Sequence, residues 1–133
     1  MAQHSLLSRR VSVSKERQIL GNEGERIAES YLKEKGYRLV ERNYRCPVGE
    51  LDLIALDRRV IVFVEVKTRS DDRFGTPLES VHLRKQKKMI KAALFFLSQR
   101  RLHHREARFD VVGISLVDRK PMVEHVKNAF ELP

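Results

Sequence analysis

The chain has 133 residues, of which 41% are hydrophobic and 34% are charged, and its formal net charge is +9. This length fits a single domain of the usual ~100–150 residues. No apolar run reaches the ~20 residues that a membrane-spanning helix needs, so we expect no contact with a membrane. The single cysteine, Cys46, excludes an intrachain disulfide and fits the reducing cytoplasm, where we expect the protein to reside.

The charge balance is strongly basic, with 27 Lys and Arg residues against 18 Asp and Glu residues. Such an excess indicates a polyanionic partner, and nucleic acid is the first candidate. A solvated basic surface without such a partner is the alternative. The five histidines form no ligand-spaced cluster with Cys46, so we expect no zinc site.

The N-terminal segment, residues 1–20, is rich in Ser and Arg and lacks the apolar core of a secretory signal. We interpret it as a flexible basic arm that precedes one domain over residues 21–133. The first helix is predicted over residues 22–35, with Asn22 as its N-cap and Gly36 as the residue that ends it. Apolar residues recur there at helical spacing, namely Ile27, Ala28, Tyr31 and Leu32.

Three strands are predicted next, over residues 37–45, 50–57 and 60–68. The last two are joined by Arg58-Arg59, which are not the residues favoured in primed hairpin turns, so the turn type stays open.

The second half of the chain begins with a predicted loop over residues 69–78 and a long helix over residues 79–101. Strands are expected over residues 109–116 and, after Pro121, over residues 122–126. The order αβββαβ, with this short last strand, predicts an α/β domain in which helices flank a central mixed β-sheet.

Acidic residues interrupt the apolar pattern of the second and third strands. In the third strand Ile61, Phe63, Glu65 and Lys67 share one face, while valines form the other. Both faces begin apolar, which predicts a central strand that is buried on both sides. A carboxylate on such a face must be paired or must bind a metal, because a bare buried charge is costly.

The hairpin register predicts where a second carboxylate lies. Counting back from the Arg58-Arg59 turn places Asp52 opposite Glu65 and Glu50 opposite Lys67. Directly opposed side chains have Cβ atoms ~4.5–5.5 Å apart, where two like charges repel. A divalent cation held between them removes the conflict, and oxygen ligands indicate Mg²⁺ or Mn²⁺. The alternative is that both carboxylates pair separately with Lys67 and nearby arginines.

Two further residues have competing roles. Lys67 could orient or deprotonate an attacking water, or stabilise a charged transition state, because it follows Glu65 on the same face. The alternative is a lysine that only balances the charge of Glu50 or Glu65. Glu25 matches a capping box with Asn22, and it also flanks the buried side of the helix, where it could reach the metal site. The sequence supports these two roles of Glu25 equally.

The long helix and the loop before it suggest supporting groups. Gln86 extends the apolar stripe of the helix, and it could hydrogen-bond either a site carboxylate or a backbone group. Asp110 stands beside Arg108, which favours a structural salt bridge. Basic side chains on the loop and helix are suited to phosphate contact, or else form a solvated face; the candidates are Arg69, Arg73, Arg84, Lys85 and Lys88.

The runs GELDLIA at residues 49–55 and VFVEVKTR at residues 62–69 resemble the YraN family of small bacterial proteins. The match covers roughly residues 20–116, because it extends to motifs within residues 21–32, 42–45, 74–75 and 108–112. That family is similar to the PD-(D/E)XK nuclease superfamily, and in its core to archaeal Holliday junction resolvases. The resemblance implies a restriction-endonuclease-like core of αβββαβ order.

Carried over by position, the resemblance places Asp52 at the aspartate of the nuclease motif, Glu65 at its acidic residue and Lys67 at its lysine. Glu25 matches the first-helix glutamate of resolvase-like members. Leu51 stands where the nominal motif has proline, a departure that leaves the metal-binding residues intact.

These observations lead us to expect a Mg²⁺- or Mn²⁺-dependent endonuclease that acts on DNA, selective for structure rather than for sequence. Asp52 and Glu65 would bind the metal, Lys67 would assist the water or the transition state, and Glu25 would complete the shell. Two alternatives remain: a non-catalytic nucleic-acid-binding or partner-binding protein that keeps the nuclease fold, and an RNA-directed role. A homodimer is compatible with the sequence, although no residue pattern indicates a dimer surface.

Overall fold

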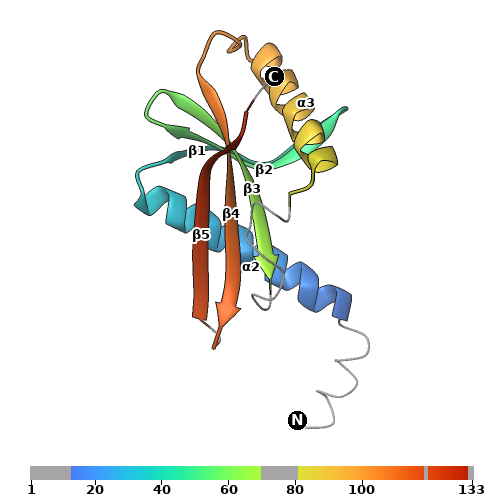
Figure 1. Cartoon of the computed structure of the whole chain (residues 1–133), viewed down its shortest axis with the longest axis vertical. Helices are drawn as coiled ribbons and strands as arrows, with labels where there is room; N and C mark the ends of the chain where they lie inside the picture. The colour runs from blue at the N-terminus through green and yellow to red at the C-terminus, as the bar shows by residue number, and fades with distance from the viewer. Residues whose placement is uncertain (1–12, 70–80, 119, 132–133) are drawn as a thin grey trace.

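The computed structural model describes residues 13–69, 81–118 and 120–131. In this part of the chain one mixed β-sheet of five strands lies against two helices, in the order αβββαββ (Figure 1). The α/β class and the predicted order are confirmed, and the last strand is longer than expected. The elements are α2 (Val13–Glu34), β1 (Arg38–Cys46), β2 (Gly49–Asp57), β3 (Val60–Arg69), α3 (Leu83–Gln99), β4 (Ala107–Val117) and β5 (Lys120–Phe130). None of the described helices is both long enough and apolar enough to cross a membrane.

The strands are arranged in the order β1-β2-β3-β4-β5. Neighbouring strands are antiparallel except for β3 and β4, which run parallel. A parallel pair needs a long crossover connection, and the segment that contains α3 supplies it. The sheet is therefore mixed, and β3 is its central strand.

The side chains of β3 enter two separate cores, as its alternating pattern predicted. Phe63 packs with residues of α3, including Phe96, whose ring centroid lies 5.9 Å away. Val62 and Val64 pack on the opposite side with Leu32 of α2. All five of these side chains are less than 3% exposed. A polar group on β3 is therefore buried unless it lies near the end of the strand.

The predicted helix boundaries need correction. Helix α2 begins at Val13 rather than at residue 22, so Asn22 is not an N-cap, and the capping-box role, one of the two that the sequence left open for Glu25, is excluded. A glycine inside a helix costs only ~1 kcal/mol, so Gly21 does not end the helix. Residues 13–20 of the expected arm are helical, and residues 1–12 lie outside the described residues.

Helix α3 begins at Leu83, later than the predicted residue 79, and residues 79–80 lie outside the described part of the chain. His82 has the extended backbone of an N-cap, with φ −66° and ψ 158°. Val81 is buried in the core that α3 covers. The apolar stripe therefore extends beyond the helix itself, which explains why the pattern predicted too long a helix.

Helix α2 approaches β3 closely at Gly24. A Cβ atom built on Gly24 would lie 2.1 Å from Thr68 Oγ1 and 3.2 Å from Thr68 Cβ, and Gly24 itself is buried. A side chain at this position would force the Thr68 side chain to move. The close approach brings the next residue of the helix, Glu25, toward the end of the sheet that carries Asp52.

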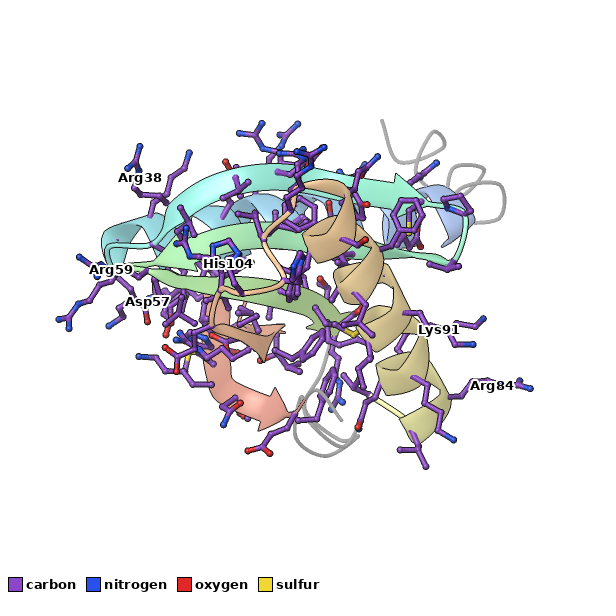
Figure 2. All side chains as sticks on the ribbon, turned by 90° about the horizontal axis from the view of Figure 1, so that it is seen from above. Arg38, Asp57, Arg59, Arg84, Lys91 and His104 are labelled. Atoms are coloured by element: carbon purple, nitrogen blue, oxygen red, sulfur yellow. The ribbon has the colours of Figure 1, made fainter. Side chains whose placement is uncertain are left out.

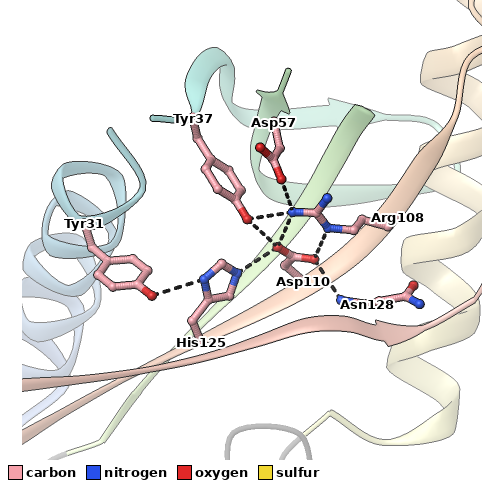
Figure 3. Close-up of polar contacts among 7 residues, drawn as sticks. All are labelled: Tyr31, Tyr37, Asp57, Arg108, Asp110, His125 and Asn128. Carbon is pink, nitrogen blue, oxygen red and sulfur yellow. Dashed lines mark hydrogen bonds and ion pairs between the residues drawn. The ribbon is translucent and has the colours of Figure 1, made fainter. Parts of the chain in front are cut away.

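A buried ion-pair network lies beside the first half of β3, on the side of the sheet that α2 covers (Figure 3). The Asp110 side chain is fully buried, and Arg108 Nε donates to its Oδ1 at 3.0 Å, which confirms the predicted salt bridge. Arg108 Nη2 also donates to Asp57 Oδ2 at 2.9 Å and to Tyr37 Oη at 2.6 Å. Burial raises the pKa of Asp110, but hydrogen bonds from His125, Arg108 and the backbone outweigh it and hold the pKa below its ordinary value.

The network continues into the last strand and the first helix. His125 Nε2 lies 2.7 Å from Asp110 Oδ2, and Tyr31 Oη lies 3.2 Å from His125 Nδ1. Because an ionised carboxylate only accepts hydrogen bonds, Nε2 carries a proton. Asp110 Oδ1 also accepts from the backbone N–H of Asn128 at 3.0 Å, where the β4–β5 register shifts. The network thus holds α2, β4 and β5 together.

The contact at Gly24 can be tested by substitution. Alanine is a better helix former than glycine, but Gly24→Ala should lower the free energy of unfolding by about 1–2 kcal/mol, because the new methyl group overlaps Thr68. Chemical denaturation of Gly24→Ala, Thr68→Ala and the double variant measures the coupling. The penalty should shrink when Thr68 is already alanine. Equal penalties in both backgrounds would contradict this account of the contact.

Candidate functional site

The two predicted carboxylates lie where β2 and β3 separate. Their ladder runs from Asp57↔Val60 to Leu53↔Val64, which confirms the predicted register, and it ends one residue before Asp52. Strand β3 stays paired with β4 as far as Arg69. The two halves of the sheet therefore part at this point.

Asp52 does not simply oppose Glu65 across this opening. Its Oδ2 accepts a hydrogen bond from the backbone N–H of Val66 at 2.8 Å. The side chain thus takes the place of the backbone acceptor that a continued ladder would have supplied. This bond fixes the Asp52 carboxylate against β3, next to the Glu65 side chain.

Glu65 is the buried acid of the site, with a side chain only 5% exposed. Burial and then the charge of Asp52 raise its pKa to about 7, although Lys85 and Lys67 oppose the shift. Lys85 Nζ lies 3.5 Å from Glu65 Oε2, and Lys67 Nζ lies 3.9 Å from Oε1. At neutral pH, in the absence of a cation other than these lysines, Glu65 thus holds a proton for much of the time.

Lys67 lies where the alternation of β3 predicted, on the side of Glu65. Lys85 was predicted on the outer face of the long helix. Instead, its side chain reaches from α3 to the buried carboxylate of Glu65. Its sequence position contains a signal for this: Lys85 precedes buried Met89 by four residues, so both lie on the inner side of the helix.

Glu25 comes within electrostatic range of the site from α2. Burial, followed by the charge of Asp52, raises its pKa, a hydrogen bond with Asn43 opposes this shift, and Glu50 adds to it. However, the described residues contain no group of three His, Cys, Asp or Glu side chains arranged to hold a metal. Glu25 is therefore a neighbour of the Asp52–Glu65 pair and does not close a three-carboxylate cluster.

Two predicted supporting contacts are not formed. Glu50 does not oppose Lys67, because the β2–β3 ladder ends before it; Glu50 Oε2 instead lies 3.6 Å from Arg45 Nε. Gln86 does not bond a site carboxylate. Its Nε2 donates to the backbone oxygen of Val81 at 2.9 Å, which is the backbone role that the sequence left open.

The donor set fits a hard divalent cation. Asp52 and Glu65 supply carboxylate oxygens and no soft ligand, as Mg²⁺ and Mn²⁺ prefer. The pKa of Glu65 is raised partly because two negative carboxylates side by side repel each other. A bound cation would remove this repulsion in place of the proton. Lys85 would have to move away from Glu65, which its partial exposure of 36% allows.

A basic pocket adjoins the acids. Its volume is about 440 Å³, and it lies between α3 and the turn from β1 to β2. Lys85 and Lys88 line it, together with Arg45. Of the other predicted phosphate contacts, Arg84 is exposed and extends outward from α3 (Figure 2), Arg69 lies at the end of β3, and Arg73 falls outside the described residues.

The raised pKa of Glu65 has a consequence for stability. In the folded protein this acid holds its proton up to about pH 7, against an ordinary value of 4.5, so folding loses stability as pH rises between these values. Glu65→Gln removes the loss. In metal-free buffer, its free energy of unfolding relative to wild type should rise by up to about 3 kcal/mol between pH 4.5 and 8, by denaturant titration. The exposed Glu106→Gln should show no such rise, and a flat profile for Glu65→Gln would contradict the assignment.

Sequence comparison relates the whole candidate site to known proteins. The family described as Uncharacterised protein family UPF0102 matches residues 24–114, a range that includes Glu25, Asp52, Glu65 and Lys67. UPF0102 proteins of Geotalea uraniireducens and Syntrophus aciditrophicus are 52% and 49% identical to this chain. The aligned parts cover 85% and 84% of this chain, and 90% and 88% of the respective relatives. A UPF0102 protein of Caldanaerobacter subterraneus is 43% identical over 84% of this chain and 93% of its own length. The chain therefore belongs to the UPF0102 family of bacterial proteins.

Proposed function

We propose that this protein is a metal-dependent endonuclease that hydrolyses phosphodiester bonds in DNA. The observation that carries the proposal is a buried glutamate, Glu65, with the carboxylate of Asp52 and two lysine ammonium groups beside it. Acids whose pKa is raised by burial and by a neighbouring acid cluster at sites that bind a metal or move a proton.

In this proposal Asp52 and Glu65 would hold Mg²⁺ or Mn²⁺, which would supply Lewis acidity toward the scissile phosphate and a more acidic bound water. The hydrogen bond from Val66 N–H keeps the Asp52 carboxylate in place for that role. Lys67 Nζ lies 3.9 Å from the carboxylate of Glu65 on the same strand, so its ammonium would be able to orient the attacking water or to balance charge on the phosphate. Glu25 would act on the site through its charge.

The basic groups around the acids suit a phosphate backbone. The first turn of α3 contains no acidic residue, although acids there would stabilise the helix. It carries Arg84 and Lys85, whose charges oppose the helix dipole and favour an anion at this end. Such contacts fix position without reading bases, which supports selectivity for nucleic-acid structure over sequence.

A second candidate is a nucleic-acid-binding protein without catalysis, directed to DNA or RNA. The observation that favours it is the compensation of Glu65 by Lys67 and Lys85, together with the lack of a three-acid cluster among the described residues. Such a protein would bind without cutting, and Asp52→Asn would change binding only by removing one negative charge. Competition between labelled DNA and unlabelled RNA separates the two nucleic acids.

The experiment that tests the proposal is cleavage of branched, flapped, single-stranded and duplex DNA with Mg²⁺, Mn²⁺ or EDTA. Asp52→Asn, Glu65→Gln and Lys67→Met should each reduce cleavage by about 100-fold or more, because each removes a group that acts in the transition state. Binding measured in EDTA should persist in all three. Glu106→Gln is the matched control, because it removes an exposed acid far from the site. Tight binding by wild type with no cutting in either metal would refute catalysis.

A further inference from the structure

A second basic pocket lies away from the candidate active site. Its volume is about 940 Å³, and it is bounded by the end of α2, the turn between β2 and β3, and β5. Tyr31, Tyr37 and His125 of the buried network form part of its wall. The network holds these side chains in fixed positions, so the pocket is built on a rigid base.

The charges that line this pocket are almost all positive. The basic residues of its lining are all exposed; they are Lys35, Arg58, Arg59 and Lys127. Within the described part of the chain, none of the four forms an ion pair. The only acid in the wall is Asp57, which Arg108 already neutralises at 2.9 Å. Four basic residues thus line this pocket without a compensating anion among the described residues.

The β2–β3 turn supports a role for two of these charges. Arg58 has φ +57°, a left-handed conformation that costs a residue other than glycine roughly 1–2 kcal/mol. Asn or Gly would adopt it more easily. A residue outside the turn also fixes its backbone, because Arg105 Nη2 donates to the backbone oxygen of Arg59 at 2.9 Å. Local folding does not explain why arginines occupy this turn.

We propose that this pocket binds the phosphate backbone of the same nucleic acid at a second place, away from the acids. The inference rests on the proposed function for the identity of its ligand. Exposed guanidinium and ammonium groups around a polar hollow suit phosphate oxygens, whereas the tyrosine hydroxyls of the wall are already bonded within the network. The contact would therefore be independent of base sequence.

The separation of the two places sets the size of the substrate. The pocket includes Val60 at the start of β3, and Glu65 lies five residues along the same strand, which is about 17 Å at ~3.3 Å per residue. Figure 2 shows Arg59 at the end of the molecule opposite Arg84. The pocket lies on the α2 side of the sheet and Glu65 faces α3, so a nucleic acid that reaches both must wrap around the edge and extend at least five base pairs from the scissile phosphate, at ~3.4 Å per base pair, or present a second arm.

The decisive variant is Arg58→Asn combined with Arg59→Ala, because it removes both charges and places at position 58 a residue that adopts the left-handed conformation more easily. Its melting temperature should equal or exceed that of wild type, so a loss of binding cannot come from unfolding. The matched control combines Arg101→Asn, another arginine with positive φ, with Lys120→Ala. Both control residues are exposed and lie outside the lining of the two basic pockets.

Binding of a fluorescein-labelled 20-base-pair duplex, and of a branched DNA with arms of the same length, is measured by anisotropy in EDTA over a range of KCl. The slope of log affinity against log salt should fall by about 2 in the turn variant, at ~0.9 for each lost phosphate contact. Affinity should fall about tenfold, and the control variant should keep the wild-type slope. A turn variant that behaves like the control would overturn the inference.

The same variant separates this inference from the proposed function. If wild type cuts DNA and the turn variant binds and cuts as well as the control, the endonuclease proposal stands and the pocket has no role in binding. If the turn variant loses affinity but wild type never cuts, the pocket is supported and the catalytic proposal fails. Failure of wild type to bind any nucleic acid in this assay would refute both.

Discussion

The carboxylates of Asp52 and Glu65 lie side by side where the β2–β3 hairpin stops pairing, and the other groups of the site compensate their charges. Asp52 is bound to the backbone of β3, and Glu65 is buried beside it, so neither can move far from the other. Positive charge must then come from elsewhere, and Lys67 and Lys85 provide it from the same strand and from α3. The raised pKa of Glu65 shows that these lysines do not fully compensate the pair. The site therefore favours an additional cation or a proton, and this requirement is the physical basis of the metal proposal.

Two buried acids lie close together in the sheet, because Asp110 of β4 pairs with Val64, the residue before Glu65, but they face opposite sides. On the α2 side, Asp110 is fully buried, yet hydrogen bonds from Arg108, His125 and a backbone N–H keep its pKa low. On the α3 side, Glu65 has longer contacts with lysines and an acid for a neighbour, and its pKa is high. A completed network stabilises the fold, whereas an incomplete one remains available for chemistry. This contrast separates the structural acid from the candidate catalytic acid more clearly than burial does.

Much of the fold was predictable because it depends on local patterns. The alternation along β3 and the position of the Arg58-Arg59 turn were enough for the register as far as Leu53 and for the two-sided burial of the strand. The end of that ladder was not predictable, because the separation of β2 from β3 is decided by the pairing of β3 with β4, far along the chain. The start of α2 was missed because Asn22 is a good cap that the helix does not use. The bond between Lys85 and Glu65 and the contacts of His125 join distant segments, and no local pattern encodes such distances.

The hydrogen bond between Tyr31 and His125 joins residues that are 94 positions apart. Around it, Leu32 of α2 packs with Val112 and Ile114 of β4, so this core is assembled from both ends of the chain. During synthesis the apolar side of α2 leaves the ribosome long before β4, which completes its cover. Contacts of such high sequence separation form late and slow folding, because a long loop must close first. The apolar side of the first helix can pack on β2 and β3 once they are made, but it stays partly uncovered until β4 has followed. The nascent protein is most exposed to aggregation or chaperone binding over that interval.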